Sequence, residues 1–503
     1  MQIILNEKQK IAVEKINKFI SQDKDKTFYL MGYPGSGKTF LISRIIKDLL
    51  ETNKIGNIFI CAPTHQALNV IESYIKSNSN SNLLSRINFM TIHKLLEFRP
   101  IIMANDGSKI FKSTKESKFL KQMEDQYIVI DECSMIQKDM VVQLQKYCDL
   151  YPIKIIYLGD REQLNPVNER ESLVFNTIPK NYEFYVLLDQ IMRTKSAEIM
   201  EVCKTIREWN KKDSLCNSLL PIHNKKIDNK TFKFYHKYKK LNANENISGF
   251  SGTSWFKNYI IKLETGNIPI ILTWKNSTAD MYNQIIRQHI HKTTNLHNYM
   301  VGDCAMFSNY YTSPDGSSFY TSDMVKILDI KTDEKILFDW MQLKLENPSN
   351  RISLGFNTIL KKISCQKNKF NINVFSVQRV YSDIISSVTN DKTYIIQTIC
   401  LDNLADYNAM LKNVQKHIEF FFKNYKDENT ASKLWAVYHK SLVDPYAIIN
   451  FGYSETTRKA QGSTLDSVFV DVQDIGENPD TDEMEKYLYT AAGRASKELG
   501  FLL

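Results

Sequence analysis

The stretch TFYLMGYPGSGKTF, Thr27 to Phe40, decides the fold. A short apolar run ends in Gly32-x-x-x-x-Gly37-Lys38-Thr39, which is the phosphate-binding P-loop pattern. Here a strand ends in a glycine-containing turn whose backbone N–H groups converge on an anion, and the following helix adds its positive N-terminal end. The sequence therefore predicts that Lys38 reaches the β- and γ-phosphates of a nucleotide and that the Thr39 hydroxyl binds Mg²⁺. The alternative is a glycine turn that merely precedes a helix. The predicted nucleotide-binding residues of this stretch are Gly32, Pro34, Gly35, Ser36, Gly37, Lys38, Thr39 and Phe40.

Composition bounds the class of protein. The chain has 503 residues, too many for one ordinary domain, and predicts roughly two to four. Its net charge of +9 is a mild bias toward polyanionic partners. Eight cysteines are scattered without a Cys-x-x-Cys pair, so neither a zinc site nor a disulfide framework is expected. The N-terminus lacks the order of a signal peptide and no run approaches about 18 apolar residues, so we expect a soluble protein, cytoplasmic or in a host compartment if viral.

A second apolar run, Gln126 to Ile130, delivers Asp131 and Glu132 at its carboxyl end. After a P-loop, this pattern indicates an ATPase in which Asp131 holds Mg²⁺ and Glu132 orients or deprotonates the attacking water. The alternative is an acidic pair that caps the next helix.

Two further strands are expected to end in polar loops. The run Lys154 to Leu158 leads into GDREQLNPV, Gly159 to Val167, in which the amide of Gln163 is suited to sense a γ-phosphate. The run Asn57 to Cys61 leads into APTHQA, Ala62 to Ala67. Open α/β sheets hold their ligands where strands end in this way.

Insertions and flanking elements complete the predicted organisation. An amphipathic helix is expected over Asn6 to Ser21, and Lys76 to Asn82 is expected to be a surface loop. Phe98 to Met123 reads as a small hairpin insertion around the Asp106-Gly107 turn. In Thr231 to Lys240, aromatic residues alternate with lysines, as in single-strand binders, but an ordinary strand with one basic face is the favoured interpretation.

The second half of the chain is expected to be β-rich between Thr294 and Val443. Loops are expected at Tyr311 to Ser317 and Asn347 to Asn350, and Leu404 to His439 is helix-prone. A final helix is predicted over Met484 to Ser496.

Together, nine segments resemble the motif set of superfamily 1 helicases, and most closely the Dda-like and RecD-like helicases of superfamily 1B. In chain order they are LNEKQ (Leu5 to Gln9), GYPGSGKT, APTHQA, TIH (Thr91 to His93), IDE (Ile130 to Glu132), GDREQLNPV, the L-x-x-x-x-R of Leu188 to Arg193, KAQG (Lys459 to Gly462) and YTAAGRA (Tyr489 to Ala495). The resemblance extends from Leu5 almost to Leu503.

The resemblance implies an α/β fold with two RecA-like P-loop motor domains, each a parallel sheet with flanking helices. It also implies a small hairpin insertion and a β-rich, SH3-like accessory insertion. The implied domains are residues 1–188 with the hairpin at 98–123, residues 189–293 with 444–503, and the accessory insertion 294–443.

The resemblance also implies roles for residues at the nucleotide. Gln9 corresponds to the glutamine that bonds the adenine edge, which makes ATP with Mg²⁺ the expected cofactor. Arg193 and Arg494 correspond to two arginines that reach the γ-phosphate from the second motor domain, as arginine fingers supplied in cis. Gln461 and Gly462 correspond to a motif at the same cleft. The predicted catalytic residues are therefore Lys38, Asp131, Glu132, Gln163, Arg193 and Arg494.

Contacts to single-stranded DNA are implied at Thr64, His65, Thr91, His93 and Asn276. They would be made mainly to the backbone and by stacking, so binding should tolerate sequence and depend on salt.

Four further residues are candidate DNA contacts. Pro100 and Phe111 of the hairpin are candidate wedges between base pairs, although a hairpin-core role is the alternative. Trp435 is expected either to clamp the hairpin across DNA or to pack in a helical core. Arg458 replaces a histidine, and Gly493 a threonine, that are frequent in the family, which puts step size or coupling in doubt.

The sequence thus predicts an ATP-dependent DNA helicase that moves 5′ to 3′ on single-stranded DNA and opens duplex, in replication, recombination or repair. Expected partners are single-stranded DNA and single-strand/duplex junctions, with replication or single-strand-binding proteins, and the chain is expected to be a monomer. The rivals are an RNA helicase or nucleoprotein remodeller of the same superfamily, and a catalytically weak scaffold that uses ATP only to switch.

Overall fold

The computed structural model describes residues 5–78, 81–113, 117–121, 126–190, 192, 196–209, 214–224, 231–237, 252–296, 298–345, 349–380 and 392–503. These form two compact units, which are taken one at a time. Unit 1 comprises Met1–Glu97, Lys115–Asn283 and Tyr453–Leu503, and unit 2 comprises Phe98–Thr114 and Gln284–Gly452.

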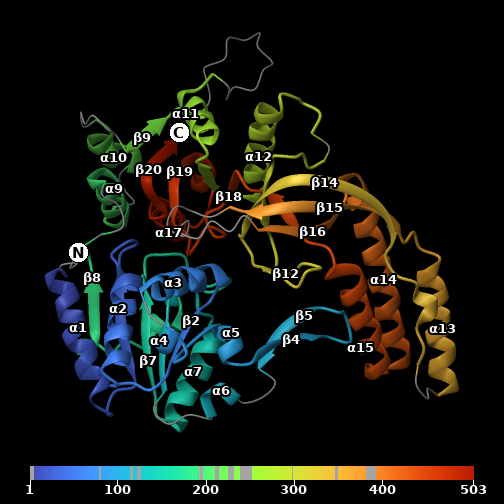
Figure 1. Ribbon diagram of the computed structural model, residues 1–503, viewed down its shortest axis with the longest axis horizontal. Helices are drawn as coiled ribbons and strands as arrows, with labels where there is room; N and C mark the ends of the chain where they lie inside the picture. The colour runs from blue at the N-terminus through green and yellow to red at the C-terminus, as the bar shows by residue number, and fades with distance from the viewer. Residues whose placement is uncertain are drawn as a thin grey trace. The chain divides into compact units, whose positions relative to one another are not determined.

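Unit 1 contains a first lobe built on six parallel strands in the order β3-β2-β6-β7-β1-β8. Their near-continuous apolar sequences suit strands that helices cover on both faces, and the core runs through them (Figure 1). The strands are β1 (Thr27–Gly32), β2 (Ile58–Ala62), β3 (Ile87–Thr91), β6 (Gln126–Ile130), β7 (Ile153–Gly159) and β8 (Tyr185–Leu188). The helices are α1 (Glu7–Ile20), α2 (Lys38–Glu51), α3 (His65–Asn78), α4 (Ser81–Leu84), α5 (Ile92–Leu95), α6 (Lys118–Lys121), α7 (Lys138–Leu150) and α8 (Leu173–Asn176), with the 3₁₀ turn η1 (Cys133–Met135).

The second lobe of unit 1 is a five-stranded parallel sheet in the order β18-β10-β19-β20-β9. Its strands are β9 (Phe232–Tyr235), β10 (Ile270–Thr273), β18 (Ser454–Thr456), β19 (Leu465–Asp471) and β20 (Ala495–Leu502). Its helices are α9 (Ala197–Arg207), α10 (Leu215–His223), α11 (Ser254–Glu264), α16 (Val472–Gly476) and α17 (Thr481–Ala492), and α12 (Asn276–His291) begins here and ends in unit 2. The predicted fold class, parallel sheets flanked by helices as in RecA-like motor domains, is confirmed.

Unit 2 contains an antiparallel sheet in the order β16-β15-β14-β11-β17 around its own apolar core. The strands are β11 (Cys304–Phe307), β14 (Met324–Ile336), β15 (Lys369–Arg379), β16 (Thr393–Ile399) and β17 (Ile449–Phe451), beside the small pair β12 (Tyr311–Thr312) and β13 (Ser318–Phe319). A helical bundle with a second core is made of η2 (Trp340–Gln342), α13 (Asn350–Ser364), η3 (Leu401–Asn403), α14 (Leu404–Tyr425), α15 (Glu428–Val437) and the π-helical turn η4 (Tyr438–Val443).

The predicted hairpin is present in unit 2 as β4 (Phe98–Ile102) paired antiparallel with β5 (Lys109–Ser113). Its turn reaches the bundle, as Figure 1 shows where β4 ends and β5 begins beside α15. The Trp435 indole donates from Nε1 to the Ala104 carbonyl at 3.1 Å, and His439 Nε2 lies 3.1 Å from the Gly107 carbonyl oxygen. Lys109 pairs with Asp444 at 2.9 Å.

Several predicted boundaries were wrong. The stretch Lys76 to Asn82 is not all loop, because α3 continues to Asn78 and α4 begins at Ser81. Unit 2 runs from Gln284 to Gly452 and includes β17, which pairs with β11, whereas the accessory domain at 294–443 stays a prediction. Helix α13 was missed within the segment read as β-rich, and β12 lies in the expected loop at Tyr311.

Candidate nucleotide and nucleic-acid site

The P-loop has the predicted strand-turn-helix form. Strand β1 ends at Gly32, and α2 begins at Lys38. Gly37 adopts the left-handed conformation, φ +82°, which a glycine accommodates without a Cβ penalty. Lys38 Nζ donates to the carbonyl oxygens of Gly32 at 2.7 Å and Tyr33 at 3.0 Å, so its ammonium lies inside the loop.

The acidic pair lies opposite the start of α2. The Thr39 hydroxyl donates to Asp131 Oδ2 at 3.1 Å, so the two predicted metal ligands are neighbours. Burial raises the pKa of the Asp131 carboxyl to about 6, with a further rise from the charge of Glu132 and an opposing effect from Lys38. Glu132 itself is held at φ +51°, an uncommon conformation for a residue with a side chain.

These residues fit a nucleotide with Mg²⁺. A hydroxyl and a carboxylate oxygen are hard ligands, and Mg²⁺ sites commonly use only one or two protein groups together with phosphates. Ser36 Oγ is buried without a hydrogen-bond partner in the described part of the chain, as expected of a group that a phosphate oxygen would satisfy. Gln9 is buried, and its Nε2 lies 3.3 Å from where a Cβ on Gly37 would stand, so it lies against the loop as predicted. Phe40 is the third residue of α2.

Arg494, a residue of the second lobe, reaches this site. Its Nη2 donates to Gln163 Oε1 at 2.9 Å, and its Nη1 lies 4.0 Å from Glu132 Oε1. The side chain is buried, and burial lowers the pKa of the guanidinium while Glu132 opposes that shift. Two predicted catalytic residues of the first lobe are thus joined by one arginine of the second. Arg193, the other predicted finger, lies outside the described residues.

A second connection between the lobes was not predicted. Arg207 of α9 donates from Nη1 to Asp160 Oδ1 at 2.9 Å and to the Tyr489 hydroxyl oxygen at 2.9 Å. Tyr489 in turn donates to Asp160 Oδ2 at 2.8 Å. The Arg207 guanidinium also lies 4.2 Å from the ring centroid of Tyr33 in the P-loop. Burial lowers the pKa of Arg207, but the charges of Asp160 and Tyr489 and the hydrogen bonds to both together raise the pKa overall.

Close approaches between the lobes explain other residues. A Cβ on Gly493 would stand 2.7 Å from Cβ of Pro34, so the threonine usual in the family does not fit here. Gln461 donates from Nε2 to the Leu164 carbonyl at 3.4 Å, and Gly462 faces Ala67. The residues predicted for the cleft therefore lie at the contact between the lobes.

The predicted DNA contacts of the first lobe gather at one edge. Strands β2 and β3 are parallel neighbours with Ala62 paired to Thr91, so the turns that follow them are adjacent. The hydroxyls of Thr64 and Thr91 accept from backbone N–H groups of the next turns, which fixes both loops. Burial, then the charges of Lys94 and His93, lowers the pKa of His65 to about 4, so these three side chains lie together. Burial also lowers the pKa of His93.

The second lobe carries a matching edge, where β10 and β18 are parallel neighbours. Asn276 begins α12 directly after β10 and is exposed. Arg458 stays a predicted DNA contact, and here its guanidinium is engaged with the Asn165 carbonyl at 2.9 Å and Glu483 at 3.0 Å. It therefore joins the two lobes in this structure.

Of the hairpin candidates, the structure leaves Pro100 and Phe111 as predictions, because their side chains lie outside what it describes. Trp435 is fully buried, so a direct contact of its ring with DNA is corrected to a packing role. That role holds the hairpin: a Cβ on Gly107, whose φ is +67°, would stand 2.3 Å from the Trp435 ring.

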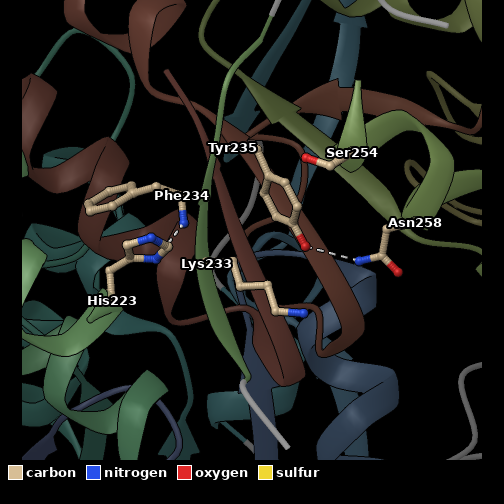
Figure 2. A pocket seen from close by; sticks show the side chains of 6 residues that line it. All are labelled: His223, Lys233, Phe234, Tyr235, Ser254 and Asn258. Carbon is tan, nitrogen blue, oxygen red and sulfur yellow. Dashed lines mark hydrogen bonds between the residues drawn. The ribbon is translucent and has the colours of Figure 1, made fainter. Parts of the chain in front are cut away.

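The basic, aromatic stretch around β9 is an ordinary strand, as favoured from the sequence. Phe232 is fully buried and packs against Phe501, with ring centroids 5.3 Å apart. Outside it lies a hollow of about 420 Å³, lined by His223, Lys233, Phe234, Tyr235, Ser254 and Asn258. In Figure 2, the Asn258 amide points to the Tyr235 hydroxyl, 3.1 Å away, and His223 accepts from the Phe234 backbone N–H at 3.2 Å.

In the ranges that the structure describes, no helix is long and apolar enough to cross a membrane.

These features define a class. A P-loop with a threonine and aspartate pair, a glutamate beside them and an arginine supplied by a second parallel-sheet lobe are the parts of a two-lobed nucleoside triphosphatase.

Comparisons with known proteins identify the family. Residues 9–169 match the AAA domain, and residues 451–502 match the UvrD-like helicase C-terminal domain. The uncharacterized protein R530 of Acanthamoeba polyphaga mimivirus is 50% identical over 504 residues, 99% of this chain and 100% of that protein. The RecBCD enzyme subunit RecD of Buchnera aphidicola subsp. Schizaphis graminum is 31% identical over 151 residues, 29% of this chain and 24% of RecD.

Solved Pif1 helicases are also similar. The structure from Candida albicans shares 15% identity at a TM-score of 0.45, covering 100% of this chain and 95% of that one. The Bacteroides structure in complex with ADP-AlF3 and ssDNA shares 14% identity at a TM-score of 0.48, covering 99% and 92%. The chain belongs to the family of R530, and its C-terminal part matches a UvrD-like helicase domain.

Proposed function

We propose that this protein is a helicase that acts on DNA, translocates 5′ to 3′ along a single strand and separates the duplex ahead of it. The observation that carries the proposal is the Arg494 side chain, which joins Gln163 and Glu132 across the two lobes. Because one lobe holds the nucleotide and the other supplies the arginine, hydrolysis depends on how closely the lobes meet. That dependence is what converts ATP turnover into movement.

The catalytic roles follow from position. When bound, ATP supplies the γ-phosphoryl group and Mg²⁺ balances the charge that develops on it. Lys38 binds the phosphates, Thr39 and Asp131 hold the metal ion, and Glu132 orients and deprotonates the attacking water. Gln163 and Arg494, with Arg193 as the second proposed finger, contact the γ-phosphate and lose that contact after hydrolysis. The lobes then reopen.

The DNA track is proposed along the two strand-end edges. Thr64, His65, Thr91 and His93 would contact the strand from the first lobe, and Asn276 from the second. Each edge is fixed to its own sheet, so opening and closing of the lobes changes the spacing between the two sets of contacts. A strand bound alternately by one set and the other would advance in steps.

The same motor could act on RNA, or remodel nucleoprotein, since no described side chain is assigned to a 2′-hydroxyl. Among the similar proteins, the Bacteroides Pif1 helicase is bound to ssDNA, which favours DNA. A role in replication, recombination or repair is proposed with it.

Comparing ATP turnover with matched DNA and RNA single strands tests the substrate. We expect strong stimulation by DNA and little by RNA, with the Lys38→Ala variant inactive on both. Stimulation by RNA alone would overturn the proposed substrate, and full activity of Lys38→Ala would overturn the motor.

A further inference from the structure

The helical bundle of unit 2 carries a concentrated positive charge. Helices α13 and α14 together contain six lysines and arginines and two acidic residues, Asp406 and Glu419. That is a net charge of +4, against +9 for the whole chain. Nearly half of the excess charge therefore lies on one pair of packed helices.

The two helices present this charge on a common face. Lys362 of α13 lies 5.6 Å from the ring centroid of Phe420 on α14, and Asn413 donates to Gln366 at 3.3 Å, so the helices meet along this seam. Lys416 and Lys423 lie four residues before and three after Phe420, so they share its side of α14. Lys412 extends the row by one more turn. The bundle face is defined as Lys362, Lys412, Lys416, Phe420 and Lys423.

The lysines of the bundle face are not used to hold the fold. Within the described residues none of the four makes an ion pair, and all four are exposed, whereas nearby Lys367 pairs with Asp406 at 2.7 Å. The next acidic residue, Asp427, accepts from the Thr430 backbone as the cap of α15. Glu419 lies three residues after Lys416 and four before Lys423, so it offsets part of the charge of this face. The remaining like charges repel one another, and a polyanion would relieve that repulsion.

Phe420 adds an apolar contact in the middle of the charge. Its side chain is 52% exposed, whereas the next residue of α14, Phe421, is fully buried. The burial of His417 and the neighbouring charge of Lys362 lower the pKa of that imidazole, which is the expected effect of a positive surface. The exposed lysines around this ring are of the kind that contacts a nucleic-acid phosphate backbone.

The position of the bundle indicates which part of a nucleic acid its charged face contacts. The turn of the β4–β5 hairpin is bonded to α15 through Trp435 and to η4 through His439, so the bundle and the hairpin belong to the same compact unit, unit 2. If the hairpin separates the strands, which rests on the proposed function, the paired arm lies beside it. Along α14, Lys412 to Lys423 spans about 16 Å, the length of several phosphates of a duplex strand.

We propose that the bundle face binds the phosphate backbone of the duplex arm at a single-strand/duplex junction. Lysines supply charge without the planar geometry that reads bases, so the contact is independent of sequence. It holds the arm against the hairpin while the motor pulls one strand.

The test measures, at several salt concentrations, the binding of a DNA fork that has a duplex arm and a single-stranded tail, and the binding of the tail alone. The two proteins compared are wild type and Lys362→Glu/Lys416→Glu/Lys423→Glu. The control is Lys146→Glu/Lys180→Glu/Lys257→Glu, which changes net charge equally at exposed lysines of unit 1. We expect the bundle variant to weaken fork binding about tenfold and to reduce its salt slope by about two to three. Tail binding and tail-stimulated ATP turnover should stay unchanged and report that the variant is folded.

If the bundle variant binds the fork as tightly as wild type does, and still binds the tail, the inference is overturned. The bundle face would then be a binding site for an acidic protein. An equal loss in the control variant would also overturn it, because only long-range charge would then be at work. Failure of wild type to bind either DNA would instead overturn the proposed function.

Discussion

Arg494 and Gln163 form a buried hydrogen bond of 2.9 Å between the two lobes. The arginine is also held by the carbonyl oxygens of Ser463 and Thr490, so its position is set by the second lobe. It approaches Glu132 as well, and in the proposed finger role it would lie where charge develops on the γ-phosphoryl group.

We expect Arg494→Ala to lower ATP turnover by orders of magnitude while nucleotide affinity changes little. The finger acts in the transition state, so its loss should reduce kcat more than it alters Kd. Stopped-flow nucleotide binding and steady-state turnover measure the two effects. Lys497→Ala, an exposed neighbour paired with Asp466, is the control. Unchanged turnover in Arg494→Ala would remove it from the finger role.

The Asp160, Arg207 and Tyr489 connection should support both stability and catalysis. Tyr489→Phe removes only the hydroxyl and should cost roughly 1–2 kcal/mol, whereas Arg207→Ala leaves Asp160 buried without its cation and should cost roughly 3–5 kcal/mol. We expect Arg207→Ala to slow turnover about tenfold or more, because Asp160 anchors the loop that carries Gln163. Denaturant unfolding and ATPase assays measure these effects. Equal stabilities for the two variants would contradict this order.

Seating of the hairpin turn on the bundle should matter for unwinding more than for ATP turnover. Gly107→Ala places a Cβ against the Trp435 ring, so the turn must move. Gly316→Ala is the matched control: its φ of +82° imposes similar strain, but nothing lies within 4 Å of its Cβ. We expect Gly107→Ala, and also Phe111→Ala, to slow duplex opening while single-strand-stimulated ATPase persists. A parallel loss of both activities in Gly107→Ala would point to a folding defect.

Glu455 on β18 should make stability depend on pH. Burial raises its pKa to about 8, opposed by Lys459, and its Oε2 has no hydrogen-bond partner in the described residues. The folded state then keeps a proton that the unfolded chain loses near pH 4.5, so stability falls as pH rises from about 4.5 to 8 and levels off above.

We expect Glu455→Gln to remove this fall in stability with pH. Between pH 5 and 9 the free energy of unfolding of the variant should rise by roughly 1–3 kcal/mol relative to wild type. Thermal unfolding across this range measures it, with exposed Glu14→Gln as the control. A difference between Glu455→Gln and wild type that does not change with pH would show that Glu455 is not buried as a neutral acid.

The parts of the site that could be predicted depend on residues that are close together in the sequence. A strand followed by a turn places Lys38, Asp131 and Gln163 at the ends of parallel strands, and such strand ends lie at one edge of the sheet. Helix α13 also had a readable signal, since Ile352, Phe356, Ile359 and Ile363 follow a helical period after the capping Ser349.

The parts that could not be predicted depend on contacts between distant segments. Arg207 sits on an amphipathic helix like any other, and only folding places it against Asp160 and, 282 residues further along, Tyr489. The reason for Gly493 is likewise its approach to Pro34, which no pattern near residue 493 reveals. From the sequence, Trp435 is either a core residue or a residue that clamps the hairpin. Its hydrogen bond to the carbonyl oxygen of Ala104, far away in the sequence, shows that it holds the hairpin turn.

The central claim is tested most directly by unwinding two partial duplexes, one with a 5′ and one with a 3′ single-stranded tail, under single-turnover conditions with ATP and Mg²⁺. A DNA helicase moving 5′ to 3′ opens only the 5′-tailed substrate. Opening of the 3′-tailed substrate alone would contradict the polarity, and opening of neither, despite DNA-stimulated ATPase, would contradict strand separation itself.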